Sequence, residues 1–288
     1  MEHAPQPAEV TGPTRAGGGS GYGWGVKIGM PDLIDALLFD LDGVLTPTAL
    51  VHAAAWGELF DEFLRQRYGD GFTPFDRVRE YDDYVDGKPR VDGVRSFLAA
   101  RHIDLPEGSP DDGSDAPTIN GLAARKDEIF QAFVERDGVK PYPGSVEYLK
   151  AARAAGLKTA VVSSSRNCEQ IVTSAGLAEY LDVRVDGVTS AKESLRGKPE
   201  PDTFLNAAFK LDVEPAHAAV FEDATSGVAA ARAGSFGYVV GVDRVDHNGE
   251  NEHADALREH GADIVVLDLA DLLGTDASMP PETQGDIT

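Results

Sequence analysis

The chain of 288 residues is strongly acidic, with 49 Asp and Glu against 26 Lys and Arg and a formal charge of −23. This charge disfavours nonspecific binding to nucleic acid or to an anionic membrane, so an anionic substrate would need a local cluster of basic side chains. The single cysteine, Cys168, excludes an internal disulfide and a cysteine-based metal cluster. No apolar run approaches the roughly 18–20 residues of a membrane-spanning helix, and no secretory signal is visible. We expect a cytoplasmic monomer with no nucleic-acid or membrane partner.

The first half of the chain predicts a tail, one strand and a helical insertion. Residues 1–32 are rich in glycine and proline and predict a flexible tail. The apolar run within residues 33–48 predicts the first strand of a buried sheet. Residues 49–139 have apolar side chains at helical spacing, interrupted by a Pro/Gly/Asp loop over residues 105–117, and predict a helical cap domain.

Helical and short apolar segments alternate in the second half of the chain. This alternation predicts a parallel sheet covered by helices on both faces, which is a doubly wound, Rossmann-like α/β core formed by residues 33–48 and 140–275. Residues 276–288 are predicted to be a second loose tail. The predicted elements of the core after residue 140 are 145–155, 158–163, 167–175, 201–210, 218–222, 225–233, 237–242 and 263–267.

The most informative motif is the sequence FDLDGVLT, which begins at Phe39. It places the carboxyl groups of Asp40 and Asp42 where an apolar run ends and Gly43 begins a tight turn. Ligands of open α/β sheets bind at the carboxyl ends of the strands. Two acids there can bind a hard cation, or one can attack phosphorus while the other moves a proton. The motif does not fit an EF-hand loop, because Gly43 is fourth rather than sixth from Asp40. Taken alone, it also fits an ordinary acidic turn.

Three further motifs follow in order, and each has a simpler alternative reading. An apolar run ends in hydroxyl groups at Ser163, which suit a phosphate but also suit a helix cap. Lys198 precedes a Pro-x-Pro turn, and by itself it reads as a surface lysine. Another apolar run ends in the adjacent acids Glu222 and Asp223, which is unusual without a cation to hold.

Together, the four motifs resemble those of the haloacid dehalogenase superfamily of phosphoryl-transfer enzymes, over residues 33–273. The resemblance implies that Asp40 is the nucleophile that forms an aspartyl-phosphate and that Asp42 is the general acid and base. It also implies that Ser163 holds the transferring phosphoryl group and that Lys198 balances its charge. Phosphoryl transfer depends mostly on positioning and charge stabilisation, so a lysine and a cation are the expected helpers.

The same resemblance implies a Mg²⁺ cofactor. Its ligands would be Asp40, Glu222, Asp223 and the backbone carbonyl of Asp42. Carboxylate and carbonyl oxygens suit Mg²⁺, which also keeps waters and a phosphate oxygen in its octahedron.

Between these motifs the chain more closely resembles the β-phosphoglucomutase family. The resemblance implies a set of residues that recognise the sugar and its second phosphate: Thr48, His52, Arg90, Lys126, Ser165, Arg166 and Asn167.

Within this set, the resemblance implies that Arg90 and the Ser-Arg-Asn cluster hold the phosphate that is not being transferred. It also implies that His52 and Lys126 contribute to substrate recognition and to the control of Asp42. His52, Arg90 and Lys126 lie in the predicted cap, and their side chains can also be ordinary surface groups. The chain departs from the family pattern at Arg166, where the family resemblance implies lysine, at Pro47, where it implies an acid, and in the insertion over residues 105–117.

These features predict a phosphoryl-transfer enzyme that acts on hexose phosphates through an aspartyl-phosphate. By resemblance it interconverts β-D-glucose 1-phosphate and D-glucose 6-phosphate through a bisphosphate, a reaction that requires two phosphate sites. A sugar-phosphate phosphatase of the same fold needs only the first of these sites and is the main alternative. A catalytically silent sugar-phosphate sensor is disfavoured, because every catalytic position is filled.

Overall fold

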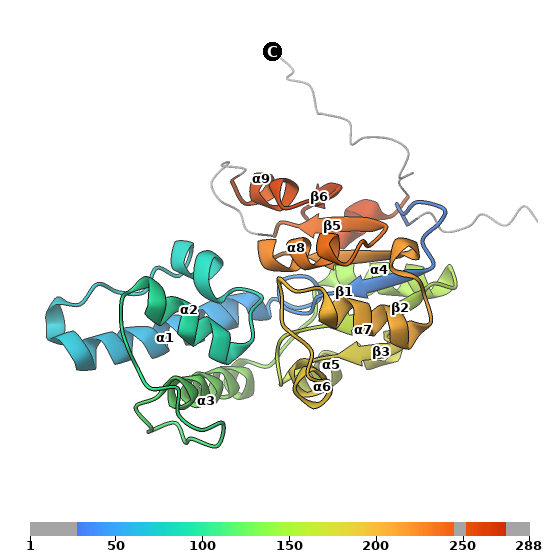
Figure 1. Ribbon diagram of the computed structural model, residues 1–288. Coiled ribbons are helices and arrows are strands. Elements are labelled where there is room, and N and C mark those ends of the chain that lie inside the picture. The colour runs from blue at the N-terminus through green and yellow to red at the C-terminus, as the bar shows by residue number, and fades with distance from the viewer. Residues whose placement is uncertain (1–27, 245–251, 275–288) are drawn as a thin grey trace, which may run out of the picture.

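The computed structural model describes residues 28–244 and 252–274. Six parallel strands form one sheet with the order β3-β2-β1-β4-β5-β6 (Figure 1). The predicted α/β class and parallel sheet are therefore confirmed. The strands are β1 (Ala36–Phe39), β2 (Lys158–Val162), β3 (Val183–Val185), β4 (Ala218–Glu222), β5 (Tyr238–Val242) and β6 (Ile264–Val266).

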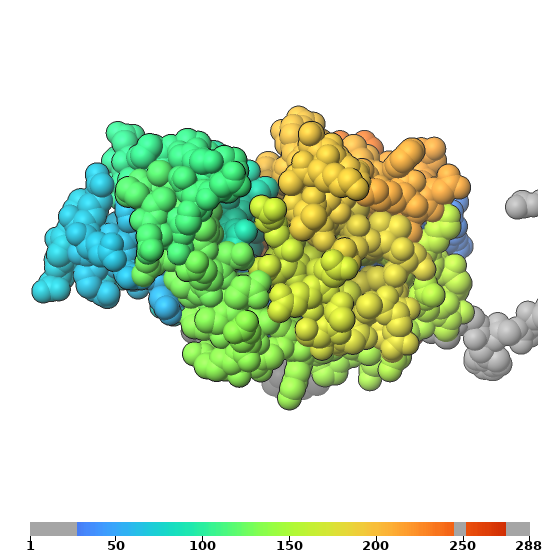
Figure 2. Space-filling view, turned by 90° about the horizontal axis from the view of Figure 1, so that it is seen from below, coloured from blue at the N-terminus to red at the C-terminus, as the bar shows by residue number. Residues whose placement is uncertain are grey.

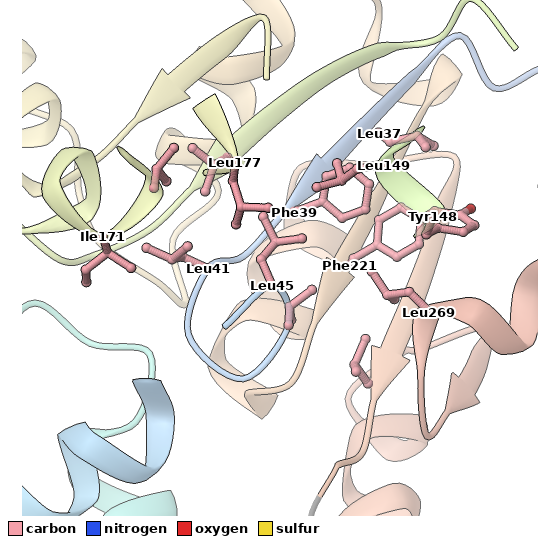
Figure 3. Packing of buried hydrophobic residues seen from close by; sticks show 14 of the residues in the cluster. Leu37, Phe39, Leu41, Leu45, Tyr148, Leu149, Ile171, Leu177, Phe221 and Leu269 are labelled. Carbon is pink, nitrogen blue, oxygen red and sulfur yellow. The ribbon is translucent and has the colours of Figure 1, made fainter. Parts of the chain in front are cut away.

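The strand β1 at the centre of the sheet is apolar at every position and is buried on both faces. Side chains alternate along a strand, so Leu37 and Phe39 of β1 join one hydrophobic cluster and Ala36 and Leu38 join the other. Figure 3 shows the first cluster, in which the ring of Phe39 stacks on that of Phe221 at 4.5 Å between centroids.

Helices from the second half of the chain cover the two faces. The first cluster includes residues of α4 (Pro143–Ala154), α5 (Cys168–Ser174) and η5 (Leu269–Leu272). The second cluster includes residues of α7 (Asp202–Leu211), α8 (Thr225–Ala233) and α9 (Glu252–Glu259). A short helix, α6 (Gly187–Glu193), follows β3. No helix among the described residues is long and apolar enough to cross a membrane.

The residues predicted as a cap form three long helices to one side of the sheet (Figure 1). They are α1 (Thr48–Tyr68), α2 (Arg90–Ala100) and α3 (Ile119–Asp137), with a π-helical turn, η2 (Tyr81–Val85), before α2. These elements share a third hydrophobic cluster, in which Phe60 stacks on Phe97 at 3.8 Å. Figure 2 shows this cap, coloured blue to green, lying against the mostly yellow and orange part of the core.

The two predicted tails lie largely outside the described residues. Residues 276–288 and most of residues 1–32 are not described. From Ile28 onward the chain is described, and Ile28 and Met30 are partly buried against the first cluster. The hydroxyl of the buried Tyr148 donates a 2.8 Å hydrogen bond to the carbonyl of Ile28.

Removal of residues 1–27 is expected to leave the melting temperature unchanged within about 1 °C, since a Gly/Pro-rich segment can bury little apolar surface. Removal of residues 1–30 also takes away Ile28 and Met30 and leaves the Tyr148 hydroxyl without its acceptor, which costs about 1–3 kcal/mol. In a chain of this size that loss corresponds to a fall of roughly 2–12 °C. Thermal unfolding of the two truncations tests this, and equal melting temperatures would contradict it.

Candidate active site

The ends of three neighbouring strands bring the predicted core motifs together. Phe39 of β1 is in register with Phe221 of β4 and with Val161 of β2. The residue after Phe39, Asp40, therefore lies beside Glu222 on one side and near the Ser163 end of β2 on the other. This is where the strand order reverses, because the chain runs from β1 to β2 and β3 on one side and returns to β4 on the other.

Asp40, Lys198 and Glu222 form a buried ion-pair network at this edge. The Lys198 ammonium contacts Oδ1 of Asp40 and Oε1 of Glu222. The backbone N–H of Asp42 donates to Oδ2 of Asp40 at 2.8 Å. Burial lowers the pKa of Lys198, but the two carboxylates outweigh burial and raise it above its usual value, so the lysine stays charged.

The carboxyl groups at this edge outnumber the cations that face them. Burial raises the pKa of Asp40 well above its usual value and, although Lys198 opposes this, Glu222 and Asp42 add to it. Burial, Asp86, Asp40 and Glu222 do the same for Asp223. A dication would relieve this crowding and allow both groups to ionise.

The shape of the motif turn also fits a cation site. Gly43 has φ +83°, and a Cβ there would lie 1.6 Å from Oδ2 of Asp223, so only glycine lets that carboxylate approach the turn. Within the described residues, no group of three or more Asp, Glu, His or Cys side chains is arranged to hold a metal ion. The donor set expected here combines side-chain oxygens with the Asp42 carbonyl, and oxygen donors of this kind suit Mg²⁺.

Asp42 is held by three polar side chains. The Thr48 hydroxyl donates to Oδ1 of Asp42, and the Ser163 hydroxyl donates to Oδ2 at 3.3 Å. Nε2 of His52 lies 3.4 Å from Oδ1. Burial alone would raise the pKa of Asp42, but His52, the Thr48 hydrogen bond and the charge of Lys126 lower it to about 2. Asp42 is therefore a carboxylate at neutral pH, and it can accept a proton.

Lys126 of α3 and His52 of α1 meet above Asp42. The Lys126 ammonium contacts Nδ1 of His52, and it lies 5.1 Å from the centroid of Trp56 and 4.8 Å from that of Phe130. Burial and the charge of Arg90 lower the pKa of Lys126 to about 7, and burial and Lys126 lower the pKa of His52. The charge of this pair is therefore sensitive to pH near neutrality and to the arrival of an anion.

Replacing Lys126 with Met is expected to raise the free energy of unfolding, most below pH 7 and least near pH 10. The amine has a pKa of about 7 when folded and its usual 10.5 when unfolded. The unfolded state therefore binds more protons between these values, so this lysine destabilises the fold fully below pH 7 and progressively less as pH rises. Denaturant titrations at about pH 6.5 and 9.5 measure the difference. The exposed Lys150→Met on α4 is the control, and a gain independent of pH would contradict the lowered pKa.

A second polar cluster lies where the loop after β2 meets the cap. The backbone N–H of Asn167 donates to the Ser165 hydroxyl at 3.1 Å. The Asn167 amide donates to Oδ1 of Asp127 at 2.9 Å, and the Arg90 guanidinium forms an ion pair with the same oxygen. Burial lowers the pKa of Arg90, which Asp127 opposes. Arg166 beside them is exposed.

One cavity of about 960 Å³ between the cap and the core joins the two clusters. Of the thirteen predicted site residues, Thr48 and Ser163 do not line it, but both donate hydrogen bonds to Asp42. The eleven that line the cavity are Asp40, Asp42, His52, Arg90, Lys126, Ser165, Arg166, Asn167, Lys198, Glu222 and Asp223.

Comparison with known proteins identifies the family. Residues 34–234 match the family model of the haloacid dehalogenase-like hydrolases. The β-phosphoglucomutase of Mycobacterium tuberculosis (strain CDC 1551 / Oshkosh) is 51% identical over 249 residues, which are 85% of this chain and 94% of that protein. The chain belongs to the β-phosphoglucomutase-like family of haloacid dehalogenase-like hydrolases. The resemblance predicted from the motifs is thus confirmed.

Solved structures of the family have the same fold. A β-phosphoglucomutase from Clostridium difficile superposes with a TM-score of 0.61 at 24% identity, covering 83% of this chain and 93% of that one. CbbY from Rhodobacter sphaeroides, in complex with xylulose-1,5-bisphosphate, superposes with a TM-score of 0.60 at 25% identity, covering 83% and 96%.

Three residues at the site of this β-phosphoglucomutase-like protein were not singled out in the sequence. Asp127 bridges Arg90 and Asn167, as described above. Asp86, on the loop before α2, lines the cavity, and burial together with Asp82 and Glu222 raises its pKa to about 7. Both resemble the many other acids of an acidic chain, so no local signal distinguishes them.

The third residue, Arg244, follows β5 and braces the turn of the first motif. Its guanidinium donates to the carbonyls of Gly43 at 3.1 Å and Val44 at 3.2 Å, and to the Ser145 hydroxyl at 2.8 Å. It also lies 3.9 Å from the centroid of Tyr142. Arg244 thus contacts both connections between the cap and the core, and only the fold brings these segments to it.

Proposed function

We propose that the protein is a β-phosphoglucomutase, which interconverts β-D-glucose 1-phosphate and D-glucose 6-phosphate through a bisphosphate. The observation that carries the proposal is that one cavity joins two separate polar clusters that contain basic side chains, Lys198 at the strand ends and Arg90 and Arg166 at the loop after β2. A phosphatase needs only the first. The identity of 51% to a mycobacterial β-phosphoglucomutase supports the same activity.

In this proposal Asp40 carries the phosphoryl group as an aspartyl-phosphate. The Asp42 carboxylate takes the proton of a sugar hydroxyl as that oxygen attacks phosphorus and the Asp40 carboxylate leaves. In the other half of the cycle, Asp40 attacks the second phosphate and Asp42 returns the proton to the sugar oxygen. The lowered pKa of Asp42 keeps its carboxyl group ionised, which the first of these roles requires. Ser163 and Lys198 hold the phosphoryl oxygens and balance their charge.

The crowded carboxylates support Mg²⁺ as the cofactor. Asp40, Glu222, Asp223 and the Asp42 carbonyl would hold it, since all are oxygen donors at the same sheet edge. When bound, Mg²⁺ neutralises charge on the transferring phosphoryl group and on the Asp40 carboxylate. Lys198 then has to balance only the remaining charge.

The second cluster would hold the phosphate that is not being transferred. Arg90 and Arg166 supply positive charge, while Ser165 and Asn167 supply hydrogen-bond donors. His52 and Lys126 would respond to the sugar phosphate and adjust Asp42, which Thr48 keeps oriented. The bisphosphate must turn over between half-reactions, so each phosphate occupies each cluster in turn.

The proposal extends to the organisation of the molecule. Residues 49–139 would act as a cap over the core of residues 33–48 and 140–275, opening to admit a hexose phosphate and closing to exclude water. The enzyme would act as a cytoplasmic monomer on small-molecule substrates.

Phosphorus NMR separates the possible functions in one experiment. The protein is supplied with β-D-glucose 1-phosphate, Mg²⁺ and a trace of β-D-glucose 1,6-bisphosphate. Appearance of glucose 6-phosphate supports the mutase. Release of inorganic phosphate without isomerisation would replace it with a sugar-phosphate phosphatase of the same fold. No reaction would point to a sensor.

Arg90→Ala is expected to depress isomerisation by roughly 10- to 150-fold, since a charge-assisted hydrogen bond contributes about 1.5–3 kcal/mol and about 1.4 kcal/mol is tenfold. Hydrolysis of acetyl phosphate, which has no second phosphate, should barely change. The ratio of released phosphate to isomerised sugar therefore rises.

The matched control is Arg136→Ala, which removes the same charge from an exposed position on α3. It should change neither activity. If Arg90→Ala lowers both activities in parallel, Arg90 acts on the fold or on cap closure rather than on the second phosphate.

A further inference from the structure

The Asp127 carboxylate joins the cap to the core at the second cluster. Asp127 lies on α3, and its Oδ1 faces both the Arg90 guanidinium at the start of α2 and the Asn167 amide before α5. Arg90 belongs to the cap and Asn167 to the core, so one oxygen of Asp127 accepts from donors that lie 77 residues apart in the chain. The contact is partly shielded, with 33% of the Asp127 side chain exposed.

The Asp127 carboxylate accepts from the same kinds of donor that would hold a bound anion. Its oxygen accepts from a guanidinium and an amide, as a phosphate oxygen does. Both donors line the cavity, and so does Asp127 itself. A phosphate oxygen that takes up the same two donors must displace the oxygen of Asp127, because both cannot occupy that position.

We propose that Asp127 competes with the non-transferring phosphate for Arg90 and Asn167 and so sets the affinity of the second cluster. The inference rests on the proposed function, since it assigns these two donors to that phosphate. Asp127 would be a specificity-determining residue that takes the place of the phosphate whenever the second cluster is empty.

Such a competitor suits a reaction in which the intermediate must turn over. When the phosphate leaves the second cluster, the largely buried Arg90 guanidinium would lose its anionic partner, and an unpaired buried charge is costly. Asp127 exchanges with the phosphate, so Arg90 keeps an anionic partner throughout. The bisphosphate is then held less tightly and is released more readily for the second half-reaction.

A supporting role for Asp127 in phosphate binding predicts a change in affinity of the opposite sign. If Asp127 served only to orient Arg90 toward the phosphate, its removal would weaken binding. If it competes, removal of its charge strengthens binding. The direction of the change in affinity therefore separates the two.

The experiment measures glucose 6-phosphate binding by calorimetry, in full-length protein carrying Asp40→Asn so that neither isomerisation nor hydrolysis consumes the ligand. Adding Asp127→Asn should tighten binding about 3- to 30-fold. This range corresponds to a free energy between that of an exposed ion pair and that of a charge-assisted hydrogen bond. Asp137→Asn, an exposed acid on the same helix, is the matched control and should change nothing.

The gain should also depend on Arg90. In a double-mutant cycle, Asp127→Asn should bring a clearly smaller gain once Arg90→Ala is present, because only the competition for Asn167 remains. Asp127→Ala, whose side chain cannot hydrogen-bond, should tighten binding as well, which covers the case in which the Asn variant folds poorly. With the Asp40 nucleophile restored, Asp127→Asn should lower KM and also lower kcat, because release of the bisphosphate becomes slower.

Weaker, unchanged or absent binding in the Asp127 variants would overturn the inference. So would a gain in affinity that is equally large without Arg90. A protein that binds glucose 6-phosphate with these changes but hydrolyses it instead of isomerising it would overturn the mutase proposal alone.

Discussion

Asp40→Asn is expected to reduce turnover of β-D-glucose 1-phosphate by roughly 10⁴-fold or more, as removal of a nucleophile does in other enzymes that use covalent catalysis. An amide cannot form an acyl phosphate as a carboxylate does. The fold should be intact, because the amide has nearly the same shape as the carboxylate and its oxygen can keep one of the two contacts, from the Lys198 ammonium to Oδ1 or from the backbone N–H of Asp42 to Oδ2. Incubation with acetyl phosphate followed by mass spectrometry measures the phosphoenzyme directly.

Asp35→Asn is the matched control, since it lies just before β1 and its side chain is 68% exposed. It should retain full turnover and full phosphoenzyme formation. A thermal melt of Asp40→Asn must show one cooperative transition, so that the loss of turnover cannot come from loss of the fold. Substantial turnover in a clean Asp40→Asn preparation would remove Asp40 from the nucleophile's role.

Sequence patterns were sufficient for the parts of the fold with long or purely apolar elements. The predicted segments 218–222 and 225–233 coincide with β4 and α8, and the other predicted core elements after residue 140 end within two residues of those observed. Burial on both faces makes such strands continuous apolar runs, which are easily recognised.

The elements that were missed are short or polar. β3 has only three residues, and Arg184 at its centre is exposed, so it reads as a loop. α6 follows it with seven residues, of which none is buried. α9 contains two Glu and one Asp in eight residues, and only Ala254 and Leu257 are buried. Tertiary contacts decide these elements rather than local propensity, because β3 pairs with β2, α6 packs against β3 and α9 packs against β5.

The candidate site could likewise be predicted only in part from the sequence. The order of the core motifs indicated the chemistry because each follows a strand, and parallel strands end at one edge of the sheet. The contacts that cap residues make are different. Lys126 meets His52 across 74 positions of the chain, and Asp127 meets Asn167 across 40. Nothing in the local sequence separates Lys126, which is 3% exposed, from an ordinary surface lysine.

The exposure of Arg166 marks the remaining departure from the expected site. Its side chain is exposed, whereas Ser165 and Asn167 on either side are half-buried. A guanidinium is longer and more rigid than the ammonium that the family resemblance implies at this position. Arg166 lines the cavity from its rim, so its charge would attract the second phosphate while Arg90 supplies the more buried contact.

Asp42→Asn is expected to slow turnover by roughly 10²–10⁴-fold, the usual contribution of a positioned general acid and base. The amide can still accept from the Thr48 hydroxyl, so the loss reports on proton transfer rather than on the position of the residue. Asp42 has a pKa of about 2, so its base form persists through mildly acidic pH, and the deficit should be nearly constant between about pH 5 and 8.

Comparison of Asp42→Asn with Asp223→Ala tests how the two acids divide their roles. Asp42 is expected to bind Mg²⁺ through its backbone carbonyl, which the substitution keeps, whereas Asp223 would offer its side chain. Calorimetric titration of Mg²⁺ should therefore show near wild-type affinity in Asp42→Asn and a clear loss in Asp223→Ala. The Asp223 carboxylate packs against the backbone of Gly43, so its removal also leaves space in the motif turn, and melting temperatures of both variants must accompany the titrations. Equal loss of Mg²⁺ affinity in the two variants would mean that the Asp42 side chain binds the metal. The general acid and base would then have to be sought among its neighbours, and His52, whose Nε2 lies 3.4 Å from Oδ1 of Asp42, would be the first candidate.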